Sequence, residues 1–191
     1  TRYHATGGVT PSHEWTEGLL DYYYLTGRRE GLEAATRVAE NIMRHMAQPR
    51  MSTPGEASVR EGGWALRAMV GMYLGTGEEK WLAEARRLAN MYLDWYEQYG
   101  ALLAPYTSHS MPRVVFMIAL TVNSFARYLL IDDNERVKRL IVSNVDDMLA
   151  HCLGPDGITY YKELPSLRRS LPTPHVIESL THAWRLTGNE H

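Results

Sequence analysis

The sequence predicts an all-α domain, an array of antiparallel helical hairpins with about seven helices in two layers. Three observations predict it: a repeat of about fifty residues, an alternation of apolar and amphipathic segments, and a tight turn inside each repeat. The turns end at Gly27, Gly77, Asp132 and Gly188, at successive spacings of 50, 55 and 56 residues. A repeat of this length is typical of stacked supersecondary units joined by loops of variable length.

The first helical segment of each repeat is apolar on nearly all sides. These segments are 15–25, 64–74, 114–130 and 176–186. A helix without a polar face must be covered on most sides by other parts of the protein. We therefore expect the four segments to form an inner layer.

The second segment of each repeat is amphipathic. In the first repeat an apolar stripe faces one way, with charged residues opposite; the stripe is formed by Leu32, Ala35, Ala39, Ile42, Met43 and Met46. The same 3.6-residue periodicity recurs between Trp81 and Trp95 and between Val137 and Leu149. Half-buried helices of this kind predict an outer layer that covers the inner one.

The connections place the short turns and the long loops at opposite ends of the array. Inside a repeat the helices are joined by a Thr-Gly type of turn, where glycine supplies the left-handed residue that ends a helix. Between repeats the loops are long, over 48–63, 100–113 and 154–174. Because binding and catalytic residues concentrate on loops, we expect the functional site at the long-loop end.

Composition narrows the function classes. The 191 residues fit one domain, and 45% hydrophobic with 22% charged residues exclude wholesale disorder. A net charge of −2 without a Lys/Arg cluster argues against a nucleic-acid partner, and no apolar run is long enough to cross a membrane. The single cysteine, Cys152, excludes an internal disulfide and a multi-cysteine zinc site. We expect no cofactor and no metal, and the compartment stays open because no targeting signal is visible.

One segment resembles a known superfamily. The run GGVTPSHEWTEGLL at 7–20, continuing into YYLTG at 23–27, is similar to a hairpin of the (α/α) toroid, or six-hairpin glycosidase, superfamily. Its bacterial carbohydrate-active members include unsaturated-uronide hydrolases, arabinofuranosidases and polysaccharide lyases. The resemblance implies a toroid of about six hairpins that acts on carbohydrates.

This chain has fewer hairpins than the resemblance implies. We place them at about 12–47, 62–99 and 112–152, followed by the first helix of a fourth from 174. We therefore expect a single repeat domain over 1–191 that forms an incomplete barrel and belongs to a longer chain. Its ends should expose apolar side chains such as Trp184, covered by the rest of that chain or by a second copy.

Four ionisable residues are candidates for catalysis: His13, Glu14, Glu17 and Glu61. Ser12 is a good N-cap, and a helix that begins at His13 would carry His13, Glu17 and Asp21 on one stripe. Glu61 precedes the second inner segment and could face Glu14 or Glu17, and glycoside hydrolysis needs two carboxylates. Acidic residues at helix starts are also ordinary helix-start chemistry. The HExxH zinc pattern is absent, since His13 and Glu14 are followed by Glu17.

Candidates for substrate binding come from the same end of the predicted array: His4, Trp15, Trp64, Tyr106, His109, Arg113 and His175. The chain has twelve Tyr and five Trp against two Phe, and such rings combine an apolar face for sugar stacking with a polar tip. The same aromatic residues also suit plain helix packing. A Tyr, a His and an Arg in the 100–113 loop would also suit a lyase, in which a cation neutralises a uronate carboxylate.

The sequence thus predicts a glycoside hydrolase-like domain that binds or cleaves an oligosaccharide or polysaccharide in a cleft at the long-loop end. Two alternatives remain: a polysaccharide lyase-like toroid, and a non-catalytic helical-repeat domain that only binds. Convergence of Glu14 or Glu17 with Glu61 on one pocket would favour catalysis. Carboxylates held in structural salt bridges would favour the binding domain.

Overall fold

The computed structural model describes residues 10–52, 59–103, 113–163 and 174–188. Within these ranges the regular elements are helical: η1 (Pro11–His13), α1 (Glu17–Thr26), α2 (Arg29–Met46), α3 (Pro49–Ser52), α4 (Val59–Thr76), α5 (Glu79–Tyr99), α6 (Val115–Tyr128), α7 (Glu135–Cys152) and α8 (Pro174–Thr187). The predicted all-α class is confirmed. The one-turn helix α3 was not predicted.

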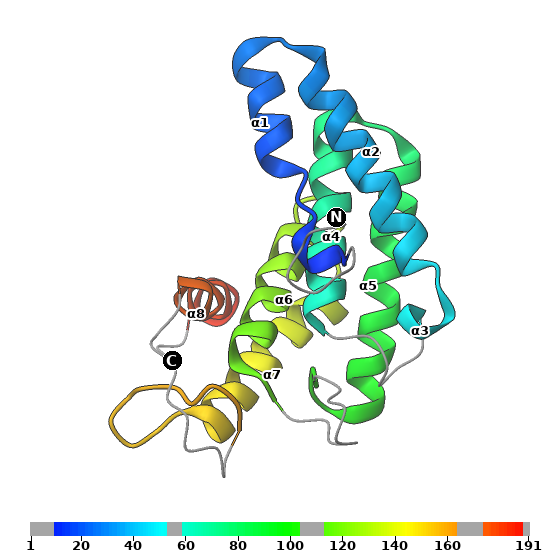
Figure 1. Cartoon of the computed structure of the whole chain (residues 1–191). Helices are drawn as coiled ribbons and strands as arrows, with labels where there is room; N and C mark the ends of the chain where they lie inside the picture. Colours follow the sequence, from blue (N-terminus) through cyan, green and yellow to red (C-terminus); the bar gives the residue numbers. More distant parts are fainter. Residues whose placement is uncertain (1–9, 53–58, 104–112, 164–173, 189–191) are drawn as a thin grey trace.

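The long helices form two layers. Figure 1 shows α1, α4, α6 and α8 following one another in a curved row, with α1 and α8 at its two ends. Each of these inner helices contacts the next one in the row, and α2, α5 and α7 pack against the row from outside. The hairpins are α1–α2, α4–α5 and α6–α7, with α8 as the first helix of a fourth. This curved, open row is the predicted incomplete barrel.

Burial follows the predicted layers, except at the ends of the row. The inner helices α4 and α6 are buried over most of their length, and α2, α5 and α7 bury one face each. The inner helices are less covered near their short turns, since Leu25 in the last turn of α1 and Leu130 just after α6 are largely exposed. On α8, Ile177 and Trp184 are 58% and 50% exposed, as expected for the end of the row.

Glycine turns end three inner helices as predicted. Gly27, Gly77 and Gly188 have φ values of 70°, 69° and 71°, in the left-handed region. Each donates its N–H to the carbonyl four residues earlier, at 2.7–2.8 Å. The third turn uses Asp132 instead, whose N–H donates to Tyr128 O at 3.1 Å while its carboxylate accepts from the Tyr128 hydroxyl at 2.5 Å. Each of these four short turns is therefore closed by a backbone hydrogen bond to the last turn of the helix before it.

The start of the first helix differs from the prediction. Residues Pro11–His13 form one 3-10 turn, Glu14 is extended at φ −124° and ψ 113°, and α1 begins only at Glu17. The predicted helix from His13, capped by Ser12, is wrong. The reason is tertiary: the Ser12 N–H donates to the Glu61 carboxylate at 2.7 Å, and this buried bond fixes η1 against α4. His13 is therefore not on the helical stripe of Glu17 and Asp21.

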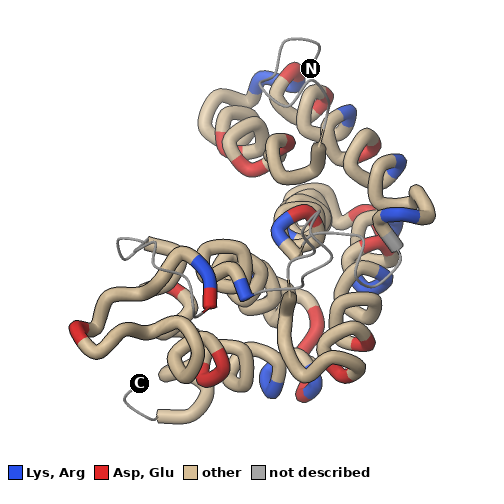
Figure 2. The backbone as a smooth tube through the Cα atoms, turned by 60° about the horizontal axis from the view of Figure 1, so that its bottom comes forward, with Lys and Arg blue, Asp and Glu red and all other residues tan. Residues whose placement is uncertain are grey.

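Charged residues are spread over the helices. Figure 2 shows basic and acidic positions interspersed along the described chain rather than gathered by sign. Some form ion pairs between outer helices, as where Arg136 of α7 contacts Asp94 and Glu97 of α5, each at 2.8 Å. None of the helices in the described ranges has the length and apolarity that a bilayer crossing requires.

Candidate functional site

Three inner helices meet at one carboxylate. Glu17, the first residue of α1, accepts a hydrogen bond from Arg67 Nε of α4 at 2.9 Å. Its other oxygen lies 3.0 Å from Arg127 Nη2 of α6. The three side chains are partly buried, and each guanidinium faces the same negative charge. We call Glu17, Arg67 and Arg127 the Glu17 centre.

An open cleft of about 570 Å³ begins at the Glu17 centre. It runs along α1 and α4 from Glu17, at the long-loop end of α1, to Tyr24 near the short turn, and Asp21 lies between them. Glu17 and Asp21 are one helical turn apart, which places their Cβ atoms about 5–6 Å from each other on one face. The volume is within the usual range for small-molecule sites.

A glycine on α4 shapes the far end of this cleft. A Cβ atom at Gly75 would lie 2.2 Å from the Tyr24 hydroxyl oxygen, so only glycine lets the phenol approach the α4 backbone. Tyr24 is half exposed and lines the cleft. The cleft therefore has charged groups at one end and a phenol at the other.

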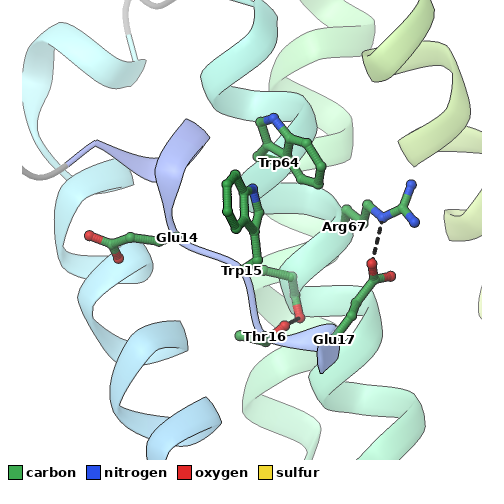
Figure 3. Close-up of a pocket in the computed structure, with 7 residues that line it drawn as sticks. Glu14, Trp15, Thr16, Glu17, Trp64 and Arg67 are labelled. Atoms are coloured by element: carbon green, nitrogen blue, oxygen red, sulfur yellow. Dashed lines mark hydrogen bonds and ion pairs between the residues drawn. The ribbon is translucent and has the colours of Figure 1, made fainter. Parts of the chain in front are cut away.

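Two tryptophans flank the Glu17 centre. The rings of Trp15 and Trp64 lie 5.6 Å apart at a tilt of 57°, and the Arg67 guanidinium lies 5.7 Å from the Trp64 ring. Figure 3 shows the two indoles next to each other, beside the Arg67–Glu17 ion pair. With Glu17 and Arg67 they line a small pocket of about 10 Å³. Trp15 is 54% exposed, so an aromatic face is available next to the charged groups.

Glu14 has a different partner from the one expected. Figure 3 shows its side chain pointing away from the tryptophans and Arg67, towards α2. Asn41 of α2 donates from Nδ2 to both Glu14 oxygens, at 2.7 and 3.0 Å. The extended backbone at Glu14 turns the side chain to that side, and the bond ties the chain before α1 to α2.

Glu61 is buried and holds η1 against α4. Besides the Ser12 N–H, it contacts Arg60 Nη2 at 3.3 Å, and it does not line the 570 Å³ cleft. Its charge acts on Tyr92, whose pKa is raised by burial and, secondarily, by the Glu61 carboxylate. The structure thus brings Glu61 together with Ser12 and Tyr92, and not with Glu14.

The remaining catalytic candidate, His13, is exposed at the end of η1. Its Nδ1 atom lies 2.8 Å from Thr10 Oγ1 and 3.1 Å from Ser12 Oγ. It lines neither pocket beside Glu17. Of the four catalytic candidates, Glu17 alone is part of the 570 Å³ cleft, and Glu14 is part of the small pocket.

The substrate-binding candidates separate into three groups. Trp15 and Trp64 lie at the Glu17 centre. Arg113 instead donates to Asp147 at 2.6 and 2.9 Å and to Glu163 at 2.7 Å, and these carboxylates raise its pKa. His175 lies on α8 beside Glu178. The others, His4, Tyr106 and His109, lie outside the described residues.

The single cysteine of the chain, Cys152, lies in the core rather than beside the Glu17 centre. Within the described part of the chain, no three His, Cys, Asp or Glu side chains are grouped as metal ligands. Cys152 is buried beside Val115, Ala119, Met148 and Val176, and burial raises its pKa to about 12. The thiol therefore stays protonated at neutral pH and packs as part of the core.

Sequence reasoning missed Arg67 and Arg127. The available signal was that each is a lone cation in an otherwise almost apolar inner segment, where a charge needs a partner. The sequence places Asp21 on the stripe of Glu17 without indicating a role for it. Nothing in the sequence distinguishes Tyr24 from the tyrosines beside it.

A comparison with protein families assigns the chain to one family. Residues 10–190 match the family model described as β-L-arabinofuranosidase, GH127 catalytic domain. The chain belongs to this family. GH127 is a glycoside hydrolase family whose catalytic domain is an (α/α)6 toroid, and the curved row of inner helices is part of such a toroid. A search of curated proteins found no match.

Membership in GH127 confirms two predictions. The chain is a glycoside hydrolase-like, carbohydrate-active domain, and its substrate class is carbohydrate. The convergence of Glu14 or Glu17 with Glu61 that would favour catalysis is not found, and Glu17 and Glu61 both lie in ion pairs. The family match, and not this geometry, is the finding that does not favour the lyase-like and binding-only alternatives. The assignment of individual catalytic and substrate-binding residues stays a prediction.

Proposed function

We propose that this domain hydrolyses β-L-arabinofuranosides, with the terminal sugar held in the cleft that begins at the Glu17 centre. The observation that carries the proposal is the pair of carboxylates, Glu17 and Asp21, on one face of α1 in a cleft of about 570 Å³. The substrate class comes from the name of the matched family, β-L-arabinofuranosidase. A cleft of this size can enclose a sugar ring.

The two carboxylates have different surroundings, and this suits different roles. Glu17 is oriented by Arg67 and Arg127, so its charge is fixed towards the cleft, where it can stabilise positive charge at the anomeric carbon. Asp21 is exposed and has no ion pair among the described residues. In this proposal the Asp21 carboxyl gives its proton to the glycosidic oxygen as the bond from that oxygen to the anomeric carbon breaks. A water then adds its hydroxyl to the anomeric carbon and returns its other proton to Asp21.

The other catalytic candidates act as positioning residues in this proposal. Glu14 is held by Asn41, and Glu61 by the Ser12 N–H, so both fix the chain that leads into α1. His13 contacts Thr10 and Ser12 and does not line the cleft. Trp15 and Trp64 provide the stacking surface for a sugar next to the one being cleaved.

Release of 4-nitrophenol from 4-nitrophenyl β-L-arabinofuranoside tests the proposal. We expect Glu17→Gln and Asp21→Asn each to lower kcat/KM by about 100-fold or more, with a larger effect on kcat than on KM. Glu33→Gln, an exposed carboxylate on the outer helix α2, is the matched control and should change neither constant. Circular dichroism of each variant checks that the helices remain.

The same experiment can contradict the proposal. A folded wild-type chain that neither cleaves this glycoside nor binds it by calorimetry would overturn it. Incubation with a uronate-containing polysaccharide tests the lyase alternative, because an unsaturated product that absorbs in the ultraviolet would indicate elimination. Full activity of both variants would move the chemistry away from α1.

Coverage of the exposed α8 side chains by a second copy is a separate proposal, tested by light scattering of the purified chain.

A further inference from the structure

A second group of polar side chains lies where α8 meets α6. His175, Glu178 and His182 share one side of α8, at helical spacings of three and four residues. From α6, Asn123 Nδ2 donates to Glu178 Oε2 at 2.9 Å and to the His175 carbonyl at 3.0 Å. We call these four residues the Glu178 site. None of them lines the cleft beside Glu17.

Several polar atoms of the Glu178 site are buried without a hydrogen-bond partner among the described residues. They are Asn123 Oδ1, His175 Nδ1 and His182 Nε2. The two imidazole nitrogens lie 3.8 and 3.7 Å from the Glu178 oxygens, which is too long for a hydrogen bond. The Asn123 side chain is fully buried, and such groups are normally satisfied. The site therefore has donor and acceptor capacity for a further group.

The position of Glu178 in its helix repeats that of Glu17. Each stands ten residues before the glycine that ends its helix, Glu17 before Gly27 and Glu178 before Gly188, as Arg67 does before Gly77. Because the inner helices are equivalent members of one row, this places both carboxylates at a similar level of the array. Figure 1 shows α1 and α8 at opposite ends of that row.

The two sites are also linked through α6. Arg127 contacts Glu17, and Asn123, one helical turn earlier, contacts Glu178. Residues four apart lie on the same side of a helix. A single side of α6 therefore supplies donors to both carboxylates, one towards α1 and one towards α8.

We propose that Asn123, His175, Glu178 and His182 form a second sugar-binding site, which takes neighbouring hydroxyl groups of an oligosaccharide whose terminal unit occupies the cleft beside Glu17. A sugar hydroxyl both donates and accepts, so it can satisfy a carboxylate or amide oxygen and an imidazole nitrogen together. Glu178 and His175 are partly exposed, which leaves a path for such a ligand. This inference rests on the proposed function, because that function places the terminal sugar.

The imidazole of His182 supports this chemistry. Burial lowers its pKa, against the opposing effect of Glu178, so the ring is neutral at pH 7 and carries one donor and one acceptor nitrogen. A neutral ring is suited to a hydroxyl, whereas a protonated ring would pair with the carboxylate instead.

Binding measured by NMR tests the Glu178 site directly. The probes are methyl β-L-arabinofuranoside and an arabinofuranosyl trisaccharide. We expect the methyl glycoside to shift the indole signals of Trp15 and Trp64, and the trisaccharide to shift in addition the imidazole signals of His175 and His182. Glu178→Gln should weaken trisaccharide binding about tenfold more than methyl glycoside binding. Glu33→Gln, on the opposite layer, should weaken neither.

The outcomes separate this inference from the proposed function. If both sugars shift the indoles and neither shifts the imidazoles, the Glu178 site is refuted while the proposed function stands. An equal loss of affinity for both sugars in Glu178→Gln would also refute it. If neither sugar shifts any of these signals, the proposed function fails and the inference fails with it. Imidazole shifts caused by divalent zinc but by no sugar would overturn the assignment to hydroxyl groups.

Discussion

The packing of α4 on α5 depends on a missing side chain at Gly62. A Cβ atom built at this position would lie 2.0 Å from Tyr92 Cε2 and Cζ and 2.1 Å from the Tyr92 hydroxyl oxygen. The Tyr92 ring cannot move aside, because it is fully buried and stacked on Trp95 at 5.4 Å. We therefore predict that Gly62→Ala forces α4 and α5 apart at this point.

The size of the effect follows from two opposing contributions. Overpacking a buried position costs about 1–3 kcal/mol, and a clash with a rigid ring belongs at the upper end. Alanine gains about 1 kcal/mol over glycine in a helix interior. The net loss in the free energy of unfolding is then about 2 kcal/mol, or roughly 4–8 °C in Tm for a chain of this size.

Gly71 provides a matched control within the same helix. Its added Cβ would meet Thr16 Oγ1 at 3.7 Å and Glu17 Cγ at 3.8 Å, which are ordinary contacts. Gly71→Ala should therefore keep the helix-propensity gain and raise Tm by roughly 2–4 °C. Thermal unfolding followed by circular dichroism measures both variants. Equal shifts of Tm in the same direction for Gly62→Ala and Gly71→Ala would refute the reasoning.

Three further substitutions test other parts of the structure. Arg113→Met leaves the partly buried carboxylates Asp147 and Glu163 without their cation, so urea unfolding should show a loss of about 2 kcal/mol. Trp15→Ala should change stability by less than about 1 kcal/mol because the ring is half exposed, yet weaken sugar binding in calorimetry by roughly 3- to 10-fold. Burial lowers the pKa of His182 in the folded chain. Between about pH 6.5 and that lowered value, the imidazole is therefore protonated in the unfolded chain but neutral in the folded chain. The free energy of unfolding should therefore rise with pH through this window, and His182→Gln should flatten the rise; an unchanged slope would contradict it.

Most of the fold could be predicted because its signals are local. The Thr-Gly turns at Gly27 and Gly77 depend on residues within one helical turn, and the apolar stripe of α2 depends only on 3.6-residue spacing. The start of α1 could not be predicted in the same way. Ser12 is a favourable N-cap, but its backbone N–H is bound by Glu61 from another repeat, so tertiary contact overrides the local preference.

The candidate site could be predicted in part. Glu17 was found because acidic residues near the start of an inner helix are visible in the sequence. Its partners were not found, because Arg67 and Arg127 become neighbours only when three inner helices pack in a particular register. Glu14 was expected to be able to face Glu61, yet the extended backbone at Glu14 turns its side chain to Asn41 on the outer layer. A periodic pattern gives the face of a residue only where the helix has already begun.

Around Glu17 and Glu178, the polar groups of the inner row are arranged as donors on the middle helices α4 and α6 and carboxylates on α1 and α8. The middle helices α4 and α6 are covered on both sides, so their few polar side chains reach sideways to a partner. Arg67 and Arg127 reach Glu17 on α1, and Asn123 reaches Glu178 on α8. The side chains of Glu17 and Glu178 are 29% and 41% exposed, so each carboxylate keeps contact with water and loses less of its hydration. The same repeat position can therefore hold Glu or Arg according to its place in the row, and the two carboxylates stay accessible to a ligand along the row.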